Sequence, residues 1–339
     1  MSELSVCYAS DNNYAMLAGV SMLSLFENNK HLNDISVYFL STEISIQNES
    51  LLRQIANDYS RKIIFISIKE TVENAIKENK LPYLRKHILD EYSRFFIAEF
   101  LPKNIGRCLY LDCDTLVTST LDELNSIDIS NFICAAVVDK MSSRYKKWIG
   151  LKKENPYFNS GILLINLDSW RKQNVLSSLL LNGKLLRLSR KGWFSDQDII
   201  NSVLVDKIKT LNLRYNAIAH IEVFSTFALK FLSSGNFYGK EEINVALQKP
   251  AIIHYCTNLL GRPWHSNCKL KSAKIWKHYF QKTKWASFYK IKERKIAMQF
   301  KISGCLYKIP LIGVLLSVFY EICLEILKVN LYKLGVIKR

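Results

Sequence analysis

Two carboxylates separated by one residue, Asp112 and Asp114, directly follow the apolar run at residues 109–111. If that run is a strand of an open α/β sheet, the pair lies beyond its carboxyl end, where such sheets bind ligands. Neighbouring carboxylates in a cleft repel one another unless a cation joins them, and Mn²⁺ or Mg²⁺ binds carboxylate and phosphate oxygens together. The spacing therefore indicates a metal–diphosphate site, with a solvated Asp-x-Asp turn as the alternative.

Four further polar clusters occur along the chain. Residues 11–14 (DNNY) suit a nucleotide base and ribose, although Asp and Asn also favour a helix N-cap. Residues 158–161 (FNSG) precede an apolar run, and residues 196–198 (DQD) open an expected helix, where the helix dipole favours acidic groups in any case. His254 ends an apolar run before residues 261–265 (GRPWH), and is either a core histidine or a metal ligand.

The elements that must position these clusters alternate through the first 265 residues. Strands are predicted at residues 4–9, 35–40, 62–68, 107–111, 132–138, 161–166 and 251–254. Helices are predicted at residues 14–26, 44–59, 87–101 and 195–205, the last with Ser195 as its N-cap. This alternation predicts an α/β fold with a parallel sheet. Neither a G-x-G-x-x-G nor a Walker loop is present, so a dinucleotide or P-loop mechanism has no support.

Composition and charge divide the chain into two parts. The 339 residues are 49% hydrophobic with only 12 Gly and 6 Pro, which excludes collagen and a Pro/Gly-rich disordered chain. The net charge is +17, but residues 262–339 alone hold 17 basic and three acidic side chains. None of the eight cysteines forms a C-x-x-C pair, which argues against a zinc ribbon and favours reduced thiols in a cytoplasmic protein. The N-terminus does not resemble a signal peptide, and no apolar run is long enough to span a membrane.

The basic part predicts contact with an anionic surface. Basic and aromatic residues interleave at residues 269–301, and a mostly apolar helical stretch follows, on which Glu321, Glu325 and Lys328 form one polar stripe. Such a helix fits a membrane interface, where anionic lipid attracts Lys and Arg. Packing of this helix on protein is the alternative. We therefore expect a catalytic domain at residues 1–265 and a helical membrane-attachment region at residues 266–339.

Taken in order, five segments resemble the family-8 glycosyltransferases: YASDNNYA, LYLDCDTLV, FNSGILLINLDSW, DQDIIN and HYC…GRPWH. The bacterial branch of that family adds glucose or galactose to lipopolysaccharide or lipooligosaccharide. The resemblance covers residues 4–265 and implies a Rossmann-like GT-A fold, a UDP-glucose or UDP-galactose donor, Mn²⁺ and retention of anomeric configuration. It also implies a lipid-linked saccharide acceptor, met by a peripheral enzyme on the inner face of the cell membrane.

The resemblance also implies roles for individual residues. The metal ligands would be Asp112, Asp114 and His254, and the donor nucleotide would lie against Ala9, Asp11, Asn13, Tyr14 and Cys113. The donor sugar would contact Arg94, Asp139, Asn159 and Ser160, and its reactive face would be lined by Asp196 and Gln197. Arg262 replaces the family's Lys before Pro-Trp, and Gly261 is the expected hinge, because the family's usual Gly is Thr257 here and residues 258–260 lengthen the loop.

The expected mechanism neutralises the leaving diphosphate with the metal and Arg262. Retention arises by double displacement or by a same-face route. Gln197 is a poor nucleophile and Asp196 is assigned to hydrogen bonds with sugar hydroxyls, which favours the same-face route. Two other functions compete: a self-glucosylating primer protein, and a non-catalytic nucleic-acid-binding protein. Against the latter, the charge is confined to one end and no nucleic-acid motif occurs. Glucose versus galactose, the acceptor linkage and the oligomeric state stay open.

Overall fold

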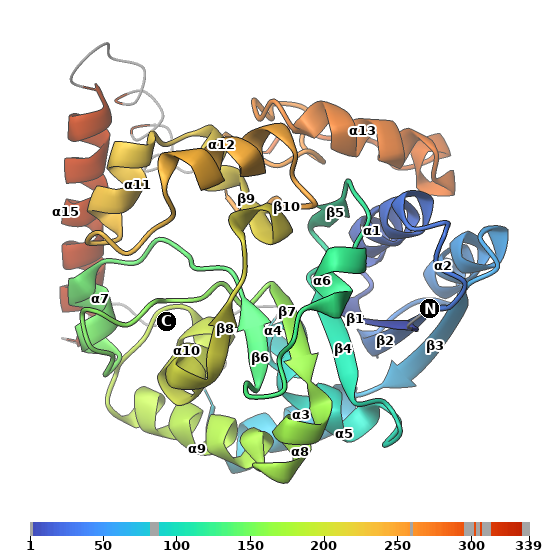
Figure 1. Cartoon of the computed structure of the whole chain (residues 1–339), viewed down its shortest axis with the longest axis horizontal. Helices are drawn as coiled ribbons and strands as arrows, with labels where there is room; N and C mark the ends of the chain where they lie inside the picture. Colours follow the sequence, from blue (N-terminus) through green and yellow to red (C-terminus); the bar gives the residue numbers. More distant parts are fainter. Residues whose placement is uncertain are drawn as a thin grey trace.

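The computed structural model describes residues 3–81, 88–257, 260–294, 302, 306 and 313–333. Its main sheet has seven strands in the order β3-β2-β1-β4-β7-β6-β8 (Figure 1). These strands are β1 (Leu4–Asp11), β2 (Ile35–Glu43), β3 (Lys62–Ser67), β4 (Arg107–Leu111), β6 (Cys134–Ala136), β7 (Ile162–Asn166) and β8 (Ile208–Thr210). A second sheet, in the order β5-β10-β9, contains β5 (Thr115–Val117), β9 (Ala217–Ile218) and β10 (Ile252–His254).

The main sheet is mostly parallel, as predicted. β1 pairs in parallel with β2 and β4, β2 with β3, and β6 with β8, whereas β7 runs antiparallel to β4 and β6. The central strands β1, β4 and β7 are buried along almost their whole length. Burial of both faces requires helices on either side of the sheet, which explains why these strands are near-continuous apolar runs.

Fourteen described α-helices surround the sheets (Figure 1). The first seven are α1 (Ala15–Asn28), α2 (Ile46–Asp58), α3 (Lys69–Glu78), α4 (Ile88–Ser93), α5 (Ile97–Phe100), α6 (Asp122–Ser126) and α7 (Ser143–Trp148). The others are α8 (Leu167–Lys172), α9 (Val175–Leu188), α10 (Ser195–Leu204), α11 (Thr226–Leu232), α12 (Lys240–Gln248), α13 (Ala273–Gln281) and α15 (Gly313–Lys333). The site lies where β4 and β10 end and β7 begins.

Two predicted helices differ from expectation in ways that shape the site. The single helix expected at residues 87–101 is interrupted by a 3₁₀ turn at Arg94–Phe96, whose three consecutive residues are all buried. The flanking residues Tyr92, Ser93, Ile97 and Ala98 are buried as well, so Arg94 lies within a fully buried segment. The predicted N-cap Ser195 is instead the first residue of α10, and Phe194 precedes it without a side-chain cap.

Part of the basic region packs into the main core. α13 contacts α1, and Trp276 stacks on Phe280 with ring centroids 5.2 Å apart. Trp285 is buried against Gly19 of α1, and its Nε1 donates to Asn48 Oδ1 at 2.9 Å. Residues 273–287 thus belong to the same core as the sheet, and the domain boundary expected after residue 265 stays a prediction.

Helix α15 lies along α7 and α11 at one end of the molecule (Figure 1). The Tyr332 ring meets Trp148 and Trp193 edge-on, at centroid distances of 5.9 and 6.2 Å. Glu325 of the predicted polar stripe accepts a hydrogen bond from Ser142 Oγ at 2.5 Å. The side chains of Glu321 and Lys328 lie outside what the structure describes. Within the described segments, no helix is both long and apolar enough to cross a bilayer.

Candidate active site

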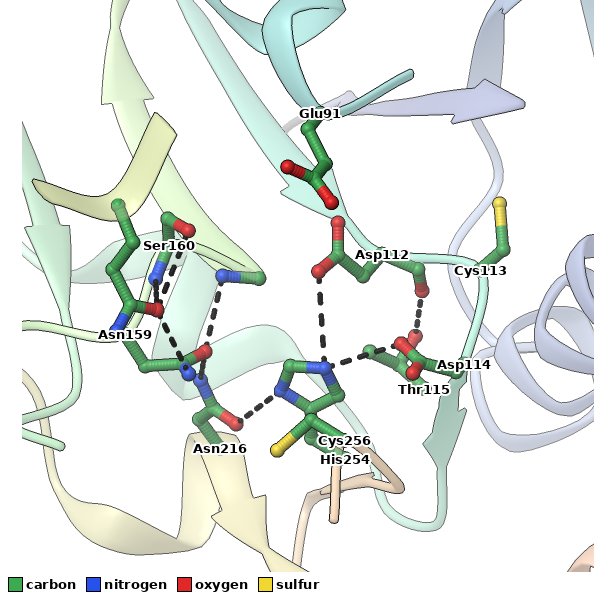
Figure 2. Close-up of polar contacts among 12 residues, drawn as sticks. Glu91, Asp112, Cys113, Asp114, Thr115, Asn159, Ser160, Asn216, His254 and Cys256 are labelled. Atoms are coloured by element: carbon green, nitrogen blue, oxygen red, sulfur yellow. Dashed lines mark hydrogen bonds and ion pairs between the residues drawn. The ribbon is translucent and has the colours of Figure 1, made fainter. Parts of the chain in front are cut away.

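Three predicted metal ligands converge at the ends of β4, β5 and β10. β10 pairs antiparallel with β5 so that His254 stands opposite Thr115, which brings its imidazole beside the Asp-x-Asp segment. His254 Nε2 lies 3.1 Å from Asp114 Oδ1 and 3.8 Å from Asp112 Oδ2 (Figure 2). One ligand atom from each residue lies within 4.8 Å of the others. The set of two carboxylates and one imidazole fits Mn²⁺ or a similar divalent cation.

Asn216 orients the imidazole, and sequence reasoning missed it. Asn216 ends a 3₁₀ helix (Leu213–Asn216) just before β9, which pairs in parallel with β10. Its Nδ2 donates to Asn159 Oδ1 at 2.8 Å, so its Oδ1 is the atom that lies 3.1 Å from His254 Nδ1. The neutral imidazole then carries its proton on Nδ1 and points the lone pair of Nε2 toward the carboxylates. Nothing in the local sequence around Asn216 marks this role.

The electrostatics of the three groups are coupled. Burial lowers the pKa of His254, but Asp114 and Asp112 outweigh it and hold that pKa above the ordinary value. Burial raises the pKa of Asp114, but His254 and Arg262 outweigh it and lower that pKa to about 2. Burial raises the pKa of Asp112 despite the opposing charge of Arg94. A proton on His254 therefore offsets part of the charge of the two carboxylates, and a bound cation would displace it.

Gly161 is required by the close packing of this site. An added Cβ would overlap Cε1 of His254 and would lie 2.6 Å from Asp112 Oδ2. The Gly161 carbonyl also accepts a hydrogen bond from the backbone N–H of Asp112 at 2.8 Å. The residue that closes the FNSG motif thus supports the metal site by leaving room for it.

Arg94 connects the predicted metal ligands to the predicted sugar-binding residues. Its buried guanidinium donates to Asp112 Oδ1 at 2.9 Å and to Ser160 O and Oγ at 2.7 and 3.0 Å. Asp196 Oδ2 lies 3.1 Å from the same guanidinium, which also stacks on the Tyr110 ring. Because both carboxylates share one fixed cation, their orientations depend on each other.

The predicted sugar-binding residues form one hydrogen-bonded group. Asn159 Nδ2 donates to Asp139 Oδ2 at 3.1 Å and to Gln197 Oε1 at 3.2 Å. Gln197 Oε1 also accepts from the backbone N–H of Ser160 at 3.1 Å, and Ser160 Oγ donates to Asp196 Oδ2 at 2.8 Å. A chain of amides therefore leads from the imidazole through Asn216 to this group.

Asp198 stands apart from the sugar-binding group. Its buried carboxylate accepts from Tyr145 Oη and Tyr157 Oη at 2.8 and 2.7 Å. It also accepts from the backbone N–H groups of Trp193 and Phe194, each at 2.6 Å. Asp198 thus fixes the start of α10, in line with the structural interpretation of this acidic residue.

The residues predicted to bind the nucleotide have two different roles in the structure. Asp11 Oδ1 accepts from the backbone N–H of Asn13 and Tyr14 at 2.9 and 3.1 Å, and Oδ2 accepts from Asn13 Nδ2 at 2.7 Å. These bonds order the turn before α1, which is the helix-capping alternative. Tyr14 and Ala9 line a cavity of about 610 Å³, and the Cys113 thiol in its wall donates to the Ala9 carbonyl at 3.3 Å.

Arg262 closes the same cavity from the other end of the chain. One of its guanidinium nitrogens lies 3.6 Å from Asp114 Oδ2, and the group stacks on the Trp264 ring. Gly261 before it has φ +77°, and a Cβ there would lie 3.1 Å from Cys268 Cα, so both conformation and space require glycine. The inserted residues 258 and 259 lie outside the described part of the chain, and the hinge role stays a prediction.

Two further carboxylates in this cavity were not anticipated. Asp90 accepts from Thr42 Oγ1 at 2.6 Å, and burial raises its pKa to about 7. Glu91 lines both this cavity and the sugar-side cavity, and its carboxylate points toward Asp112 (Figure 2). Both belong to the segment before Arg94, where only the helical pattern was apparent from sequence.

Comparisons with known proteins agree with this geometry. A family model described as "Glycosyl transferase family 8" matches residues 5–268. A putative glycosyltransferase of Haemophilus influenzae is 30% identical over 78% of this chain and 74% of its own length. A lipopolysaccharide 1,2-glucosyltransferase of Escherichia coli is 26% identical over 94% of this chain and 90% of its own. The solved structure of the galactosyltransferase LgtC with donor and acceptor sugar analogues has a TM-score of 0.68 at 23% identity, covering 84% of this chain and 99% of that one, which shows a shared fold.

Proposed function

The chain belongs to glycosyl transferase family 8 and has its GT-A fold, and from this we propose that it transfers glucose or galactose from a UDP-sugar to a lipopolysaccharide-type acceptor with retention of configuration. The observation that carries the proposal is the convergence of Asp112, Asp114 and His254 on one point. The name of the Escherichia coli relative supports a lipopolysaccharide acceptor and a glucosyl donor. A nucleic-acid-binding protein leaves this metal-ligand set without a role. A self-glucosylating primer leaves the basic C-terminal region without one.

Asp112, Asp114 and His254 would hold Mn²⁺, with Mg²⁺ as the other candidate. The bound cation supplies Lewis-acid stabilisation of the negative charge on a leaving diphosphate. Arg262, close to Asp114, adds a fixed guanidinium that suits phosphate oxygens. Ala9 and Tyr14 would hold the uridine, while Asp11 and Asn13 would bind it from the turn that they order.

On the sugar side, the contacts support the same-face route. Asp196 is paired with Arg94 and accepts from Ser160, so its charge is already committed. Gln197 is an amide whose Oε1 accepts from Asn159 and Ser160. A double displacement needs a free carboxylate in reach of the anomeric carbon, and neither residue supplies one. Asp139, Asn159 and Ser160 would bind the hydroxyls of the hexose.

Donor hydrolysis tests the proposal directly. We expect the protein to hydrolyse UDP-glucose or UDP-galactose slowly in the presence of Mn²⁺, and their N-acetyl forms less well. Asp112→Asn removes a charged metal ligand, and we expect it to reduce hydrolysis about 100-fold or more. The control is Asp168→Asn, whose side chain is 73% exposed and far from the metal ligands in the fold. Hydrolysis by Asp112→Asn within a few-fold of the unmodified protein would show that the metal site is wrongly assigned.

We also propose peripheral attachment to the cytoplasmic face of an anionic membrane through the C-terminal region. Apolar side chains of α11 and α15 are exposed on these neighbouring helices: Phe227, Phe231, Leu315, Leu316 and Phe319. An exposed apolar surface beside an excess of basic residues is typical of proteins that lie on anionic lipid. The lipid-linked acceptor would be presented at this surface.

Vesicle binding tests the attachment. We expect sedimentation with vesicles of phosphatidylglycerol and phosphatidylethanolamine at low salt, and about tenfold weaker binding for the double variant Phe227→Glu/Phe319→Glu. Ile46→Glu is the control, because Ile46 is 90% exposed on α2, at the opposite side of the molecule (Figure 1). Equal binding of the two variants would exclude this surface as the attachment site.

A further inference from the structure

The loop between α9 and α10 leads directly into two residues expected at the donor sugar. Asp196 and Gln197 are the second and third residues of α10, immediately after the loop ends at Phe194. Both side chains are tied to Ser160, which lies across the site before β7. The position of the first turn of α10 therefore determines where Asp196 and Gln197 stand relative to a donor sugar.

This loop has an irregular backbone. Arg190 and Gly192 are both in the left-handed region, with φ of +49° and +79°. Phe194, at the N-cap position of α10, provides no side-chain cap. The first N–H groups of a helix have no partner within the helix, so intrahelical bonds do not fix the entry of the chain. Contacts with other residues must therefore hold the loop in place.

Asp198 supplies the first set of these contacts. Its carboxylate accepts from the backbone N–H groups of Trp193 and Phe194, and its own backbone N–H donates to the Phe194 carbonyl at 2.7 Å. The packing is close, because a Cβ at Gly192 would lie 2.8 Å from Asp198 Oδ2. A displacement of Trp193 would therefore be passed on to the first turn of α10.

Helix α15 supplies the second contact. Tyr332 is buried, and its ring meets the rings of Trp193 and Trp148 edge-on, at interplanar angles of 88° and 79°. Such edge-to-face contacts depend on the orientation of both rings. Val329, one turn earlier on α15, is buried in the same apolar cluster as Tyr332 and Trp148. This end of α15 is thus anchored where it touches Trp193, although it lies beyond the family match that ends at residue 268.

We propose that Tyr332 is a positioning residue for the transfer reaction. Tyr332 holds the ring of Trp193 while Asp198 holds its backbone, and the two contacts together place Gln197 at the donor sugar. Such placement matters, because a displacement of about 1 Å caused by a change far from the chemistry can cost about 100-fold in rate. The proposal deepens the proposed function and rests on it.

Kinetics of donor hydrolysis by the full chain test the proposal. The residues expected to bind the nucleotide and diphosphate lie outside α10, so a misplaced α10 should lower kcat more than it alters KM. We expect Tyr332→Ala to hydrolyse the UDP-sugar with Mn²⁺ at about one tenth of the unmodified kcat, with the donor KM within about twofold. Tyr332→Phe keeps the ring and should restore kcat. Leu327→Ala is the matched control, because Leu327 lies on the same helix and is 54% exposed. An unchanged kcat in Tyr332→Ala would overturn the proposal.

A double variant tests whether Tyr332 acts through Trp193. We expect Trp193→Leu to lower kcat as well, and Tyr332→Ala/Trp193→Leu to be no slower than the slower single variant, because both changes remove the same contact. Losses that multiply in the double variant would show that Tyr332 acts by another route, and would overturn the proposal. If Tyr332→Ala does not fold, Tyr332→Leu replaces it in both comparisons: a kcat lowered about threefold supports the proposal, and an unchanged kcat overturns it.

Hydrogen exchange tests the same contact without the reaction. The backbone N–H groups of Trp193 and Phe194 are bonded to Asp198, and we expect them to exchange about tenfold faster in Tyr332→Ala than in Leu327→Ala. Equal exchange rates in the two variants would overturn the proposal. Failure of the proposed function is distinguishable, because the unmodified protein would then hydrolyse no UDP-sugar in the presence of Mn²⁺, whereas faster exchange in Tyr332→Ala would still support the contact.

Discussion

Asn216 holds the imidazole of His254 by a hydrogen bond of 3.1 Å between its Oδ1 and the histidine Nδ1. The amide nitrogen of Asn216 is already committed to Asn159, so the amide can present only its oxygen to the ring. Nε2 is thereby the atom that faces the carboxylates. A residue outside the ligand set thus selects the tautomer that can bind a metal.

Replacing Asn216 should weaken metal binding. Asn216→Leu keeps the volume but removes the acceptor, and loss of such an outer-shell partner typically costs about 10–100-fold in metal affinity. Calorimetric titration with Mn²⁺ measures this. Asn212→Leu is the control, because Asn212 caps the start of the same 3₁₀ helix and is exposed, and its side chain accepts only from the backbone N–H of Arg214 among the bonds described. Similar Mn²⁺ affinities for the two variants would contradict this role.

Gly161→Ala should damage the site more than the fold. The added methyl would overlap the His254 imidazole and crowd Asp112, whereas the backbone at Gly161 is not in the left-handed region. We expect donor hydrolysis to fall about 100-fold and the melting temperature to change by only a few degrees, since about 1–3 kcal/mol is typical of overpacking. Gly239→Ala is the control, because its nearest contact, Glu242 Oε2, would be 3.5 Å away. Comparable hydrolysis by both variants would show that the site tolerates the methyl group.

Whether the sequence predicts a site residue depends on how far apart along the chain its interacting partners lie. Asp112 and Asp114 follow a strand, so their place at the end of the sheet could be predicted from local pattern. Asn216 could not, because its role arises from pairing of β9 with β10, between segments with no distinctive pattern. Trp285 illustrates the same limit in the basic region. Its interleaved basic and aromatic residues suit a membrane surface. Trp285 is nevertheless part of the core, because Gly19 has no side chain and leaves room for its ring.

The effect of pH on stability should reverse when metal is added. The pKa of His254 is raised, so its contribution to the stability of the metal-free protein is full below about pH 6.5 and is lost as the pH rises through the folded-state value. The pKa of Asp114 is lowered to about 2, so its contribution is lost only as the pH falls below about 4. Mn²⁺ requires the deprotonated imidazole, and therefore stabilises more as the pH rises.

Melting temperatures between pH 6 and 8.5, with and without Mn²⁺, measure this reversal. We expect the stabilisation by Mn²⁺ to grow across this range in the unmodified protein and in His31→Gln, whose histidine is exposed and paired with Asp122. His254→Gln should lose most of it. A stabilisation that is independent of pH would contradict the proposed exchange of a proton for the metal.

Asp90→Asn should stabilise the protein at neutral and alkaline pH. The folded-state pKa of about 7 means that the charged form of Asp90 opposes folding, so stability falls as the pH rises from about 4 to 7. The amide keeps the acceptor for Thr42 without the charge. We expect a gain of a few degrees in melting temperature at pH 8 and little gain at pH 4, with about 1–2 °C for each kcal/mol in a chain of this length. An equal effect at both pH values would exclude a buried charge as its cause.

Trp285→Ala should destabilise the catalytic core, although Trp285 belongs to the basic region. Its ring fills the notch at Gly19 and its Nε1 is bonded to Asn48, so removal leaves a cavity between α1 and α2 that typically costs about 3–5 kcal/mol. Phe288→Ala is the matched control, because Phe288 is 53% exposed. Urea unfolding compares the two variants. If Trp285→Ala unfolds at the same urea concentration as Phe288→Ala, then this segment only rests on the catalytic core, and a chain that ends near Trp264 would fold as well as the whole.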